Sequence, residues 1–143
     1  MICTFFGHRD ADERAEDRLR EVLVDLIVNK GIRKYMVGNN GGFDKTVRRV
    51  LKQLKSEYDI EYMVVLYRLP LRKKENEDYS DTVFPEFLRN VPPQYAISRR
   101  NDWLIENSNI VVTYVIYPFG GAAKYKDIAE KRGKTVINLA QPN

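Results

Sequence analysis

The chain has 143 residues, of which 43% are hydrophobic, and this is enough to fill the core of one domain. Its net charge of +4 comes from 24 basic and 20 acidic residues that are interspersed, so the sequence has no basic stripe typical of nucleic-acid-binding proteins. A signal-peptide pattern and long apolar runs are absent, and Cys3 is the single cysteine. These features predict a cytoplasmic protein without a membrane segment or an internal disulfide.

The first half of the chain predicts strands that alternate with helices. Residues 2–6, 35–37 and 61–66 form short apolar runs, as expected for buried strands of a parallel sheet. Between these runs, apolar residues at helical spacing predict two helices, and Gly31 predicts the end of the first. Asp10 followed by Glu13 resembles a capping box at its start. The residues expected on the inner faces of the two helices are Leu19, Val22, Leu23, Leu26, Ile27, Val47, Val50, Leu51 and Leu54.

The second half continues this alternation. A charged segment at about 71–82 is expected to form an exposed loop, and a helix is expected from about residue 97 to 107–109. Residues 110–115 predict a buried strand, and a helix around Tyr125 precedes a last strand at 135–139. The whole pattern predicts one α/β domain over residues 1–143. Its expected architecture is a Rossmann-like three-layer sandwich, with a mainly parallel sheet of about five strands and helices on both faces.

Three loops follow predicted strands and contain the motifs that indicate a ligand site. These loops are Gly7-His8-Arg9, residues 38–44 and residues 117–121, and the topology places all of them at the carboxyl edge of the sheet, where ligands bind. Gly41-Gly42 and Gly120-Gly121 each precede a helix, and backbone N–H groups there can approach a phosphate closely. Glycine pairs also serve plain turns. The convergence of the three loops predicts a pocket.

Several polar side chains are candidates for this pocket. His8 is the only histidine and can bind phosphate, transfer protons or simply cap its loop. Asp44 can cap the following helix or accept hydrogen bonds from ribose hydroxyls. Arg99 and Arg100 lie on the third helix, and only one of them can face inward to hold a phosphate. The predicted ligand-binding residues are Gly7, His8, Arg9, Gly38, Asn39, Gly41, Gly42, Asp44, Arg99, Arg100, Gly120 and Gly121; no catalytic residue is assigned.

The remaining candidates have simpler interpretations. One histidine and one cysteine argue against a dedicated transition-metal site, and no cofactor is expected. Cys3 and Trp103 are expected in the core. Aromatic side chains near the last loop either pack in the ordinary way or offer a flat surface to a base. They are Tyr114, Tyr117 and Phe119.

Taken together, the motifs resemble a known family. The combination of Gly7-His8-Arg9, Gly38 with Gly41-Gly42-Phe43-Asp44, and Gly120-Gly121-Ala122 is similar to YpsA-like members of the SLOG superfamily, as is the Arg-bearing segment 98–104 before the strand at 109–112. The resemblance spans nearly the whole chain. It implies a Rossmann-like fold that binds nucleotides or nucleotide-derived signals, and it suggests a homodimer. Relatives in that superfamily include Lonely Guy-type phosphoribohydrolases and DNA-processing proteins related to DprA.

The resemblance leads to three functional hypotheses. The first is a protein that binds or senses a nucleotide-derived small molecule. The second is an N-glycosidic-bond hydrolase that acts on a nucleoside monophosphate. The third is a module that binds single-stranded nucleic acid, for which the charge pattern offers little support.

A substitution in the last glycine loop weakens the hydrolase hypothesis. The hydrolase relatives use a Pro-Gly-Gly-x-Gly-Thr-x-x-Glu loop with an arginine on the preceding helix. Residues 118–126 of this chain read Pro-Phe-Gly-Gly-Ala-Ala-Lys-Tyr-Lys, so a lysine stands near the place of the glutamate. A lysine cannot stabilise positive charge on a ribosyl carbon as a carboxylate does. The carboxylate would therefore have to come from Asp44, Asp102 or Glu106.

Overall fold

The strands of the protein form one parallel sheet. The computed structural model describes residues 1–11, 13–70 and 79–140. Within these ranges a six-stranded sheet has the order β4-β3-β2-β1-β5-β6, and all its neighbouring strands are parallel. The strands are β1 (Ile2–Gly7), β2 (Lys34–Val37), β3 (Glu61–Val65), β4 (Thr82–Val83), β5 (Ile110–Tyr114) and β6 (Thr135–Asn138). The expected sheet had about five strands; the additional one, β4, is too short to show an apolar pattern in the sequence.

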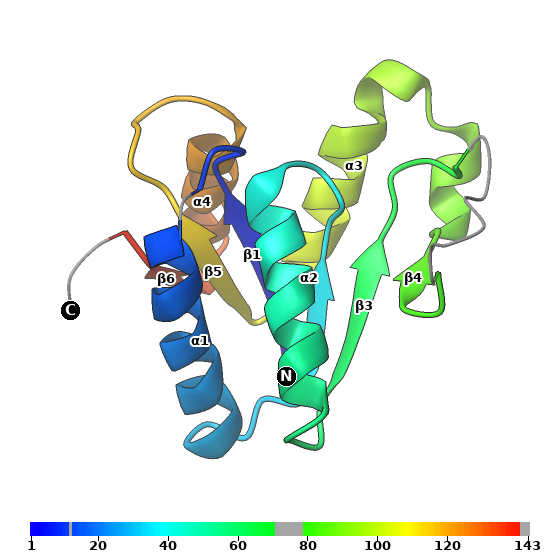
Figure 1. The fold of residues 1–143 in the computed structure, drawn as a ribbon. Coiled ribbons are helices and arrows are strands. Elements are labelled where there is room, and N and C mark those ends of the chain that lie inside the picture. Colours follow the sequence, from blue (N-terminus) through cyan, green and yellow to red (C-terminus); the bar gives the residue numbers. More distant parts are fainter. Residues whose placement is uncertain (12, 71–78, 141–143) are drawn as a thin grey trace.

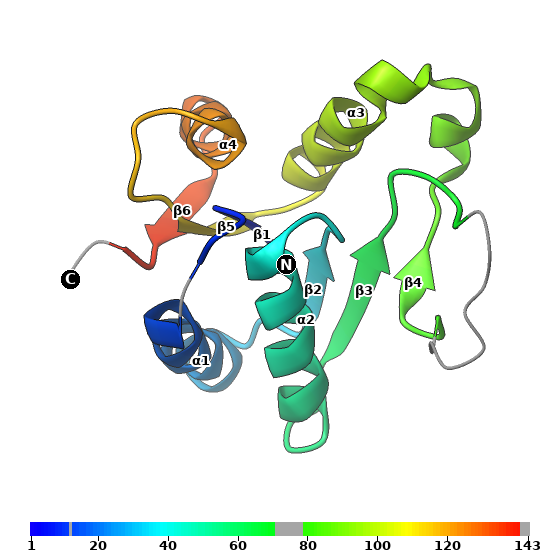
Figure 2. The ribbon, with the colours of Figure 1, turned by 45° about the horizontal axis from the view of Figure 1, so that its top comes forward.

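Helices cover both faces of the sheet, as expected for a Rossmann-like sandwich. The helices of the described residues are α1 (Glu13–Val28), α2 (Gly42–Lys55), α3 (Pro93–Glu106) and α4 (Gly121–Lys131), with the 3-10 helix η1 (Glu86–Asn90). α1 and α2 pack on one face, and α3 and α4 on the other (Figures 1 and 2). α3 begins at Pro93, earlier than the expected residue 97. Proline is favourable in the first turn of a helix because its missing N–H is not needed there.

The two faces of the sheet have separate hydrophobic clusters. Successive side chains of a strand point to opposite faces, so Phe5 packs with α1 and α2 while Phe6 packs with α3 and α4. Cys3 is fully buried in the first cluster, and burial raises the pKa of its thiol. Trp103 lies at the edge of the second cluster, against Phe87. Cys3 is therefore a core residue, as expected, whereas Trp103 is only partly buried and packs against the core.

The strand order gives the sheet a switch point between β1 and β5. The chain leaves β1 toward β2 on one side, and β5 later pairs with β1 on its other side. Gly7 and Tyr114 are register partners at the carboxyl ends of β1 and β5. The loops that follow these two strands therefore begin side by side. In open parallel sheets, ligands bind in the crevice beyond this switch point.

Two expectations are not fully described by the structure. The charged loop predicted at 71–82 lies mostly outside the described residues, and Thr82 at its end belongs to β4. The capping box depends on the side chain of Glu13, which is not described. Across the described ranges, no helix has both the length and the apolar character needed to cross a bilayer.

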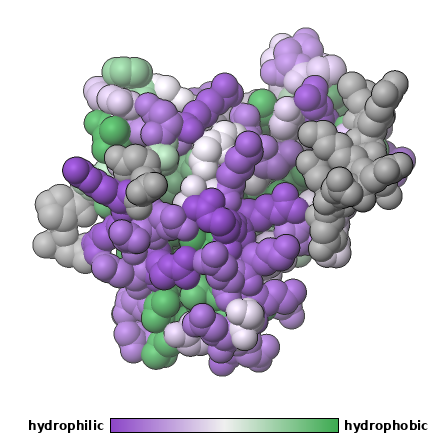
Figure 3. Space-filling model, in the orientation of Figure 1, coloured by the Kyte–Doolittle hydropathy of each residue, from purple (hydrophilic) through white to green (hydrophobic). Residues whose placement is uncertain are grey.

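The face of the molecule drawn in Figure 3 is mostly hydrophilic, with smaller hydrophobic areas between the polar side chains.

Candidate functional site

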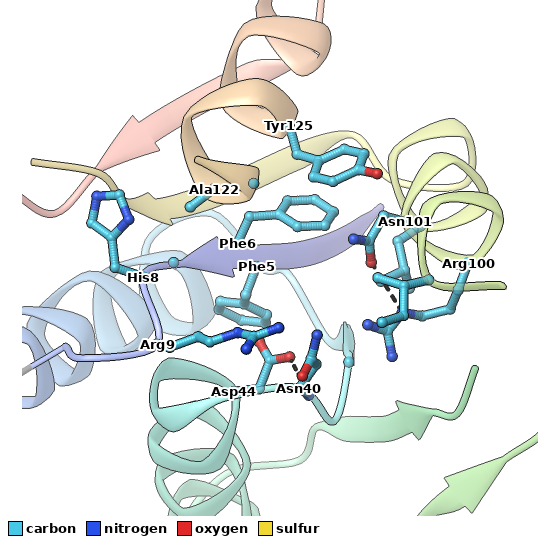
Figure 4. Close-up of a pocket in the computed structure, with 15 residues that line it drawn as sticks. Phe5, Phe6, His8, Arg9, Asn40, Asp44, Arg100, Asn101, Ala122 and Tyr125 are labelled. Atoms are coloured by element: carbon cyan, nitrogen blue, oxygen red, sulfur yellow. Dashed lines mark hydrogen bonds between the residues drawn. The ribbon is translucent and has the colours of Figure 1, made fainter. Parts of the chain in front are cut away.

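A cavity of about 400 Å³ lies at the carboxyl end of β1. It is bounded by the end of β1, the first turns of α2 and α4, and the inner face of α3 (Figure 4). The predicted site residues that line it are Gly7, His8, Arg9, Gly38, Asp44, Arg100 and Gly121. Those outside its lining are Asn39, Gly41, Gly42, Arg99 and Gly120. The fold thus brings together residues from all three predicted loops and from α3.

Arg100, and not Arg99, faces the cavity. The Arg100 side chain is buried, with 2% of its surface exposed, whereas Arg99 is exposed. Arg100 lies on the buried face of α3. Leu104, one helical turn later on the same face, is fully buried against the sheet. This settles the choice between the two arginines that the sequence left open.

The bonding partners of Arg100 are neutral. Its Nη1 donates to Asn39 Oδ1 at 2.9 Å and to the Val65 carbonyl at 3.0 Å, and its Nε donates to Asn101 Oδ1 at 3.0 Å. Within the described ranges, no carboxylate forms an ion pair with it. Burial lowers the pKa of Arg100, and the nearby charge of Asp44 partly opposes this, but a guanidinium stays protonated. A buried cation whose hydrogen-bond acceptors are neutral, and whose charge is offset only in part by Asp44, favours an anionic ligand in the cavity beside it.

Gly38 allows Arg100 to take this position. A Cβ atom at residue 38 would lie 2.9 Å from Arg100 Cζ and 3.0 Å from each terminal guanidinium nitrogen. A side chain there would displace the guanidinium. Asn39 lies outside the lining of the cavity but accepts a hydrogen bond from Arg100. The β2–α2 loop therefore positions the arginine.

Gly41 and Gly42 hold the β1–α1 loop against the start of α2. Gly41 has φ of 99°, a conformation that favours glycine, and the Gly42 N–H donates to the Arg9 carbonyl at 3.1 Å. A Cβ at Gly42 would lie 2.4 Å from that carbonyl oxygen. The N–H of Gly42, which the sequence suggested for phosphate contact, already has a partner in the protein.

The backbone at the start of α4 has free space beside it. Gly120, with φ of 95°, has nearly the same backbone conformation as Gly41, yet a Cβ at Gly120 or Gly121 would meet no atom within 4 Å. Gly121 and Ala122 line the cavity. N–H groups in the first turn of a helix lack partners within the helix and carry its positive dipole end. Of the two glycine pairs, the second therefore has the geometry that suits an anion.

Asp44 places a buried carboxyl group in the same cavity. Its Oδ2 accepts the Asn40 N–H at 2.9 Å, so Asp44 reaches back from the first turn of α2 to the preceding loop. Burial raises the pKa of Asp44 to about 6, although the Asn40 hydrogen bond and the charge of Arg100 each lower it. The other two carboxylates considered from the sequence lie elsewhere. Asp102 and Glu106 face Arg132, each at 3.8 Å.

The raised pKa of Asp44 predicts a pH-dependent effect of Asp44→Asn. Between the ordinary value of 3.8 and about 6, the folded protein binds a proton that the unfolded chain has lost, so this group's contribution to stability falls as pH rises. Asparagine keeps an oxygen for the Asn40 N–H and carries no charge. We expect Asp44→Asn to raise the free energy of unfolding by roughly 1–3 kcal/mol at pH 7.5, and to change it little at pH 3.5. Urea denaturation at both pH values measures this, and an equal effect at both would contradict it.

His8 accepts hydrogen bonds from the backbone of the β5–α4 loop. Its Nε2 accepts the backbone N–H groups of Ile116 at 2.9 Å and Tyr117 at 3.2 Å, and its ring lies 4.8 Å from the Tyr117 ring. A nitrogen that accepts hydrogen bonds carries no proton, so the proton of the neutral ring is on Nδ1. The structure thus gives His8 the loop-capping role that the sequence offered as one alternative. His8 also lines the cavity.

Replacing His8 with phenylalanine should loosen this loop. Phenylalanine keeps a ring beside Tyr117 but removes the acceptor for both N–H groups. We expect amide hydrogen exchange at Ile116 and Tyr117 to accelerate about tenfold, which corresponds to the loss of one to two hydrogen bonds. Exchange in the centre of β5 serves as the control. Unchanged exchange at the two loop amides would show that His8 does not hold the loop.

An aromatic wall of the cavity was not anticipated. Phe6 and Tyr125 stack at 5.3 Å between ring centroids, and both line the cavity, as does Asn101 (Figure 4). The spacing of Tyr125 from Gly121, one helical turn, was a signal that could have indicated it. The aromatic residues considered from the sequence lie outside the lining: Tyr117 stacks on the exposed Phe119, and Tyr114 stacks on Phe43.

The fold and the site define the class of the protein. It is an α/β protein with a Rossmann-like parallel sheet and a cavity at the switch point of that sheet. No protein-family model matches the chain, and no curated protein matches it.

Proposed function

We propose that the protein binds a nucleotide or a nucleotide-derived anion in the cavity of about 400 Å³. The observation that carries this proposal is Arg100, a buried guanidinium that lines the cavity and has only neutral acceptors among its described hydrogen-bond partners. An anionic group of a ligand would accept charge-assisted hydrogen bonds from this guanidinium. The volume lies within the range of small-molecule sites, roughly 300–1,000 Å³.

The other groups around the cavity match the parts of a nucleotide. The first turn of α4 at Gly121 offers backbone N–H groups to a phosphate, and Arg9 adds an exposed cation at the rim. Asp44 and Asn101 can hydrogen-bond sugar hydroxyls, while Tyr125 offers apolar surface. The resemblance of the loop motifs to YpsA-like SLOG proteins supports the same class of ligand, and we propose that the chain belongs to that superfamily.

A thermal-shift screen followed by product analysis tests the proposal. The purified protein is heated with each of the four common nucleoside monophosphates, with nucleotide sugars and with cyclic dinucleotides. A saturable rise in the melting temperature with unchanged ligand supports binding. No shift with any nucleotide at millimolar concentration would count against the site.

A second candidate is hydrolysis of an N-glycosidic bond, and Asp44 is the observation that favours it. A buried carboxyl group with a pKa near 6 suits proton transfer near neutral pH, and it lies in the cavity where the ribose would bind. In this case incubation with a nucleoside monophosphate would release free base, and Asp44→Asn would abolish the release without preventing binding. The absence of free base from the parent protein would exclude this activity for the nucleotides tested.

A further inference from the structure

A second cavity adjoins the first across the β2–α2 loop. Its volume is about 450 Å³, and Gly38 and Asp44 line both cavities. The additional residues around it come from α2, β3 and the segment after β3, among them Lys45 and Arg68. The two cavities therefore form a continuous surface around one loop and one carboxyl group.

A hydrogen-bonded pair links the linings of the two cavities. Arg100 lines the first cavity and Asn39 lines the second, and Arg100 Nη1 donates to Asn39 Oδ1 at 2.9 Å. The guanidinium also lies over the ring of Tyr67, a residue of the second cavity, at 5.5 Å from the centroid. Gly38, which lines both cavities, has no side chain. Lining residues of one cavity thus contact lining residues of the other.

The second cavity carries positive charge. Arg48 forms an ion pair with Asp81, with nitrogen–oxygen distances of 2.9 and 2.7 Å. Lys45 and Arg68 are exposed, and neither forms an ion pair with a carboxylate anywhere in the described part of the chain. Two cations without carboxylate partners at a cavity raise the local potential for an anion.

From this arrangement we infer that the ligand spans both cavities and carries two anionic groups separated by a sugar, which is the chemistry of a dinucleotide. This inference rests on the proposed function. The carboxylate of Asp44 lies at the junction, where it accepts hydrogen bonds from hydroxyl groups and repels phosphate. One anionic group then lies near Arg100 and the start of α4, and the other lies near Lys45 and Arg68.

Calorimetric titrations with mononucleotides and dinucleotides test the inference. The probes are the four nucleoside 5′-monophosphates and the four homodinucleotides with a 5′-phosphate, such as pApA. We expect the best dinucleotide to bind about tenfold or more tightly than its monophosphate. The double variant Lys45→Glu/Arg68→Glu should remove this gain and leave monophosphate affinity within about twofold. Lys52→Glu/Lys55→Glu, at two exposed lysines of α2 outside both linings, is the matched charge control and should keep the gain.

The outcomes separate this inference from the proposed function. If monophosphates bind and dinucleotides bind no more tightly, the first cavity is a nucleotide site and the inference is wrong. A gain that survives in the double variant would also overturn it, because the second anion would then lie elsewhere. If no nucleotide binds to the parent protein, the proposed function fails and the inference fails with it.

Discussion

Replacing Arg100 with methionine is expected to weaken nucleoside monophosphate binding about 100-fold or more. The guanidinium is buried and lines the cavity, and its hydrogen-bond acceptors in the described part of the chain are neutral. A charge-assisted hydrogen bond to a buried group is worth about 1.5–3 kcal/mol, and the loss of two such bonds corresponds to at least about two orders of magnitude in affinity. Methionine has a similar length and no charge, so the apolar contacts of the stem are retained. Calorimetry measures the affinity.

The neighbouring arginine provides the matched control for this experiment. Arg99→Met removes the same charge from an exposed position one residue away and should leave affinity within about twofold. Arg100→Lys should bind more weakly than the parent, because lysine keeps the charge but not the planar fork of donors. Circular dichroism establishes that each variant is folded. Equal losses in Arg99→Met and Arg100→Met would mean that general charge, and not this site, attracts the ligand.

Gly121→Val is expected to remove nucleotide binding from a protein that still folds. A Cβ at Gly121 meets no protein atom within 4 Å, and its backbone φ is not positive, so the folded state accepts a side chain there. The new side chain would occupy the surface at the start of α4 where a phosphate must approach the backbone closely. We expect affinity to fall by about 100-fold, with the free energy of unfolding within about 1 kcal/mol of the parent. Calorimetry and urea denaturation measure the two quantities.

The same substitution at Gly42, in the first glycine pair, is expected to have a different effect. A Cβ at Gly42 would lie 2.4 Å from the Arg9 carbonyl oxygen, so Gly42→Val should destabilise the fold by about 3 kcal/mol whether or not ligand is present. If Gly42→Val were as stable as the parent, or if Gly121→Val bound nucleotides normally, the different roles assigned to the two glycine pairs would be wrong.

Much of the fold follows from the alternation of apolar runs and helical periodicity. Those patterns are local, and they correctly predicted the parallel sheet and the helices on both faces. β4 could not be predicted because two residues carry no periodicity, and β4 is held by long-range pairing with β3. The early start of α3 was missed because proline disrupts the interior of a helix, whereas Pro93 occupies the first turn, where proline is tolerated.

The candidate site was predictable only in part, for a physical reason. Topology places loops after parallel strands at one edge, so Gly7 and Gly121 were correctly expected there. The choice between Arg99 and Arg100 depended on the phase of α3, and three successive apolar residues at 103–105 leave that phase ambiguous. The bond from Gly42 to Arg9 joins residues far apart in the chain, and no local pattern encodes it.

Nucleotide binding in this cavity can be tested by an NMR titration of the ¹⁵N-labelled protein with the nucleoside monophosphate that gives the largest thermal shift. We expect saturable chemical-shift changes that are largest at the amides of Gly7, Gly38, Gly121 and Ala122 and at the Nε–H of Arg100, which surround the cavity. Residues at the opposite edge of the sheet, such as Asn109 and Lys134, should not change. Shift changes confined to other surfaces, or none at millimolar nucleotide, would contradict the assignment of this cavity as a nucleotide site.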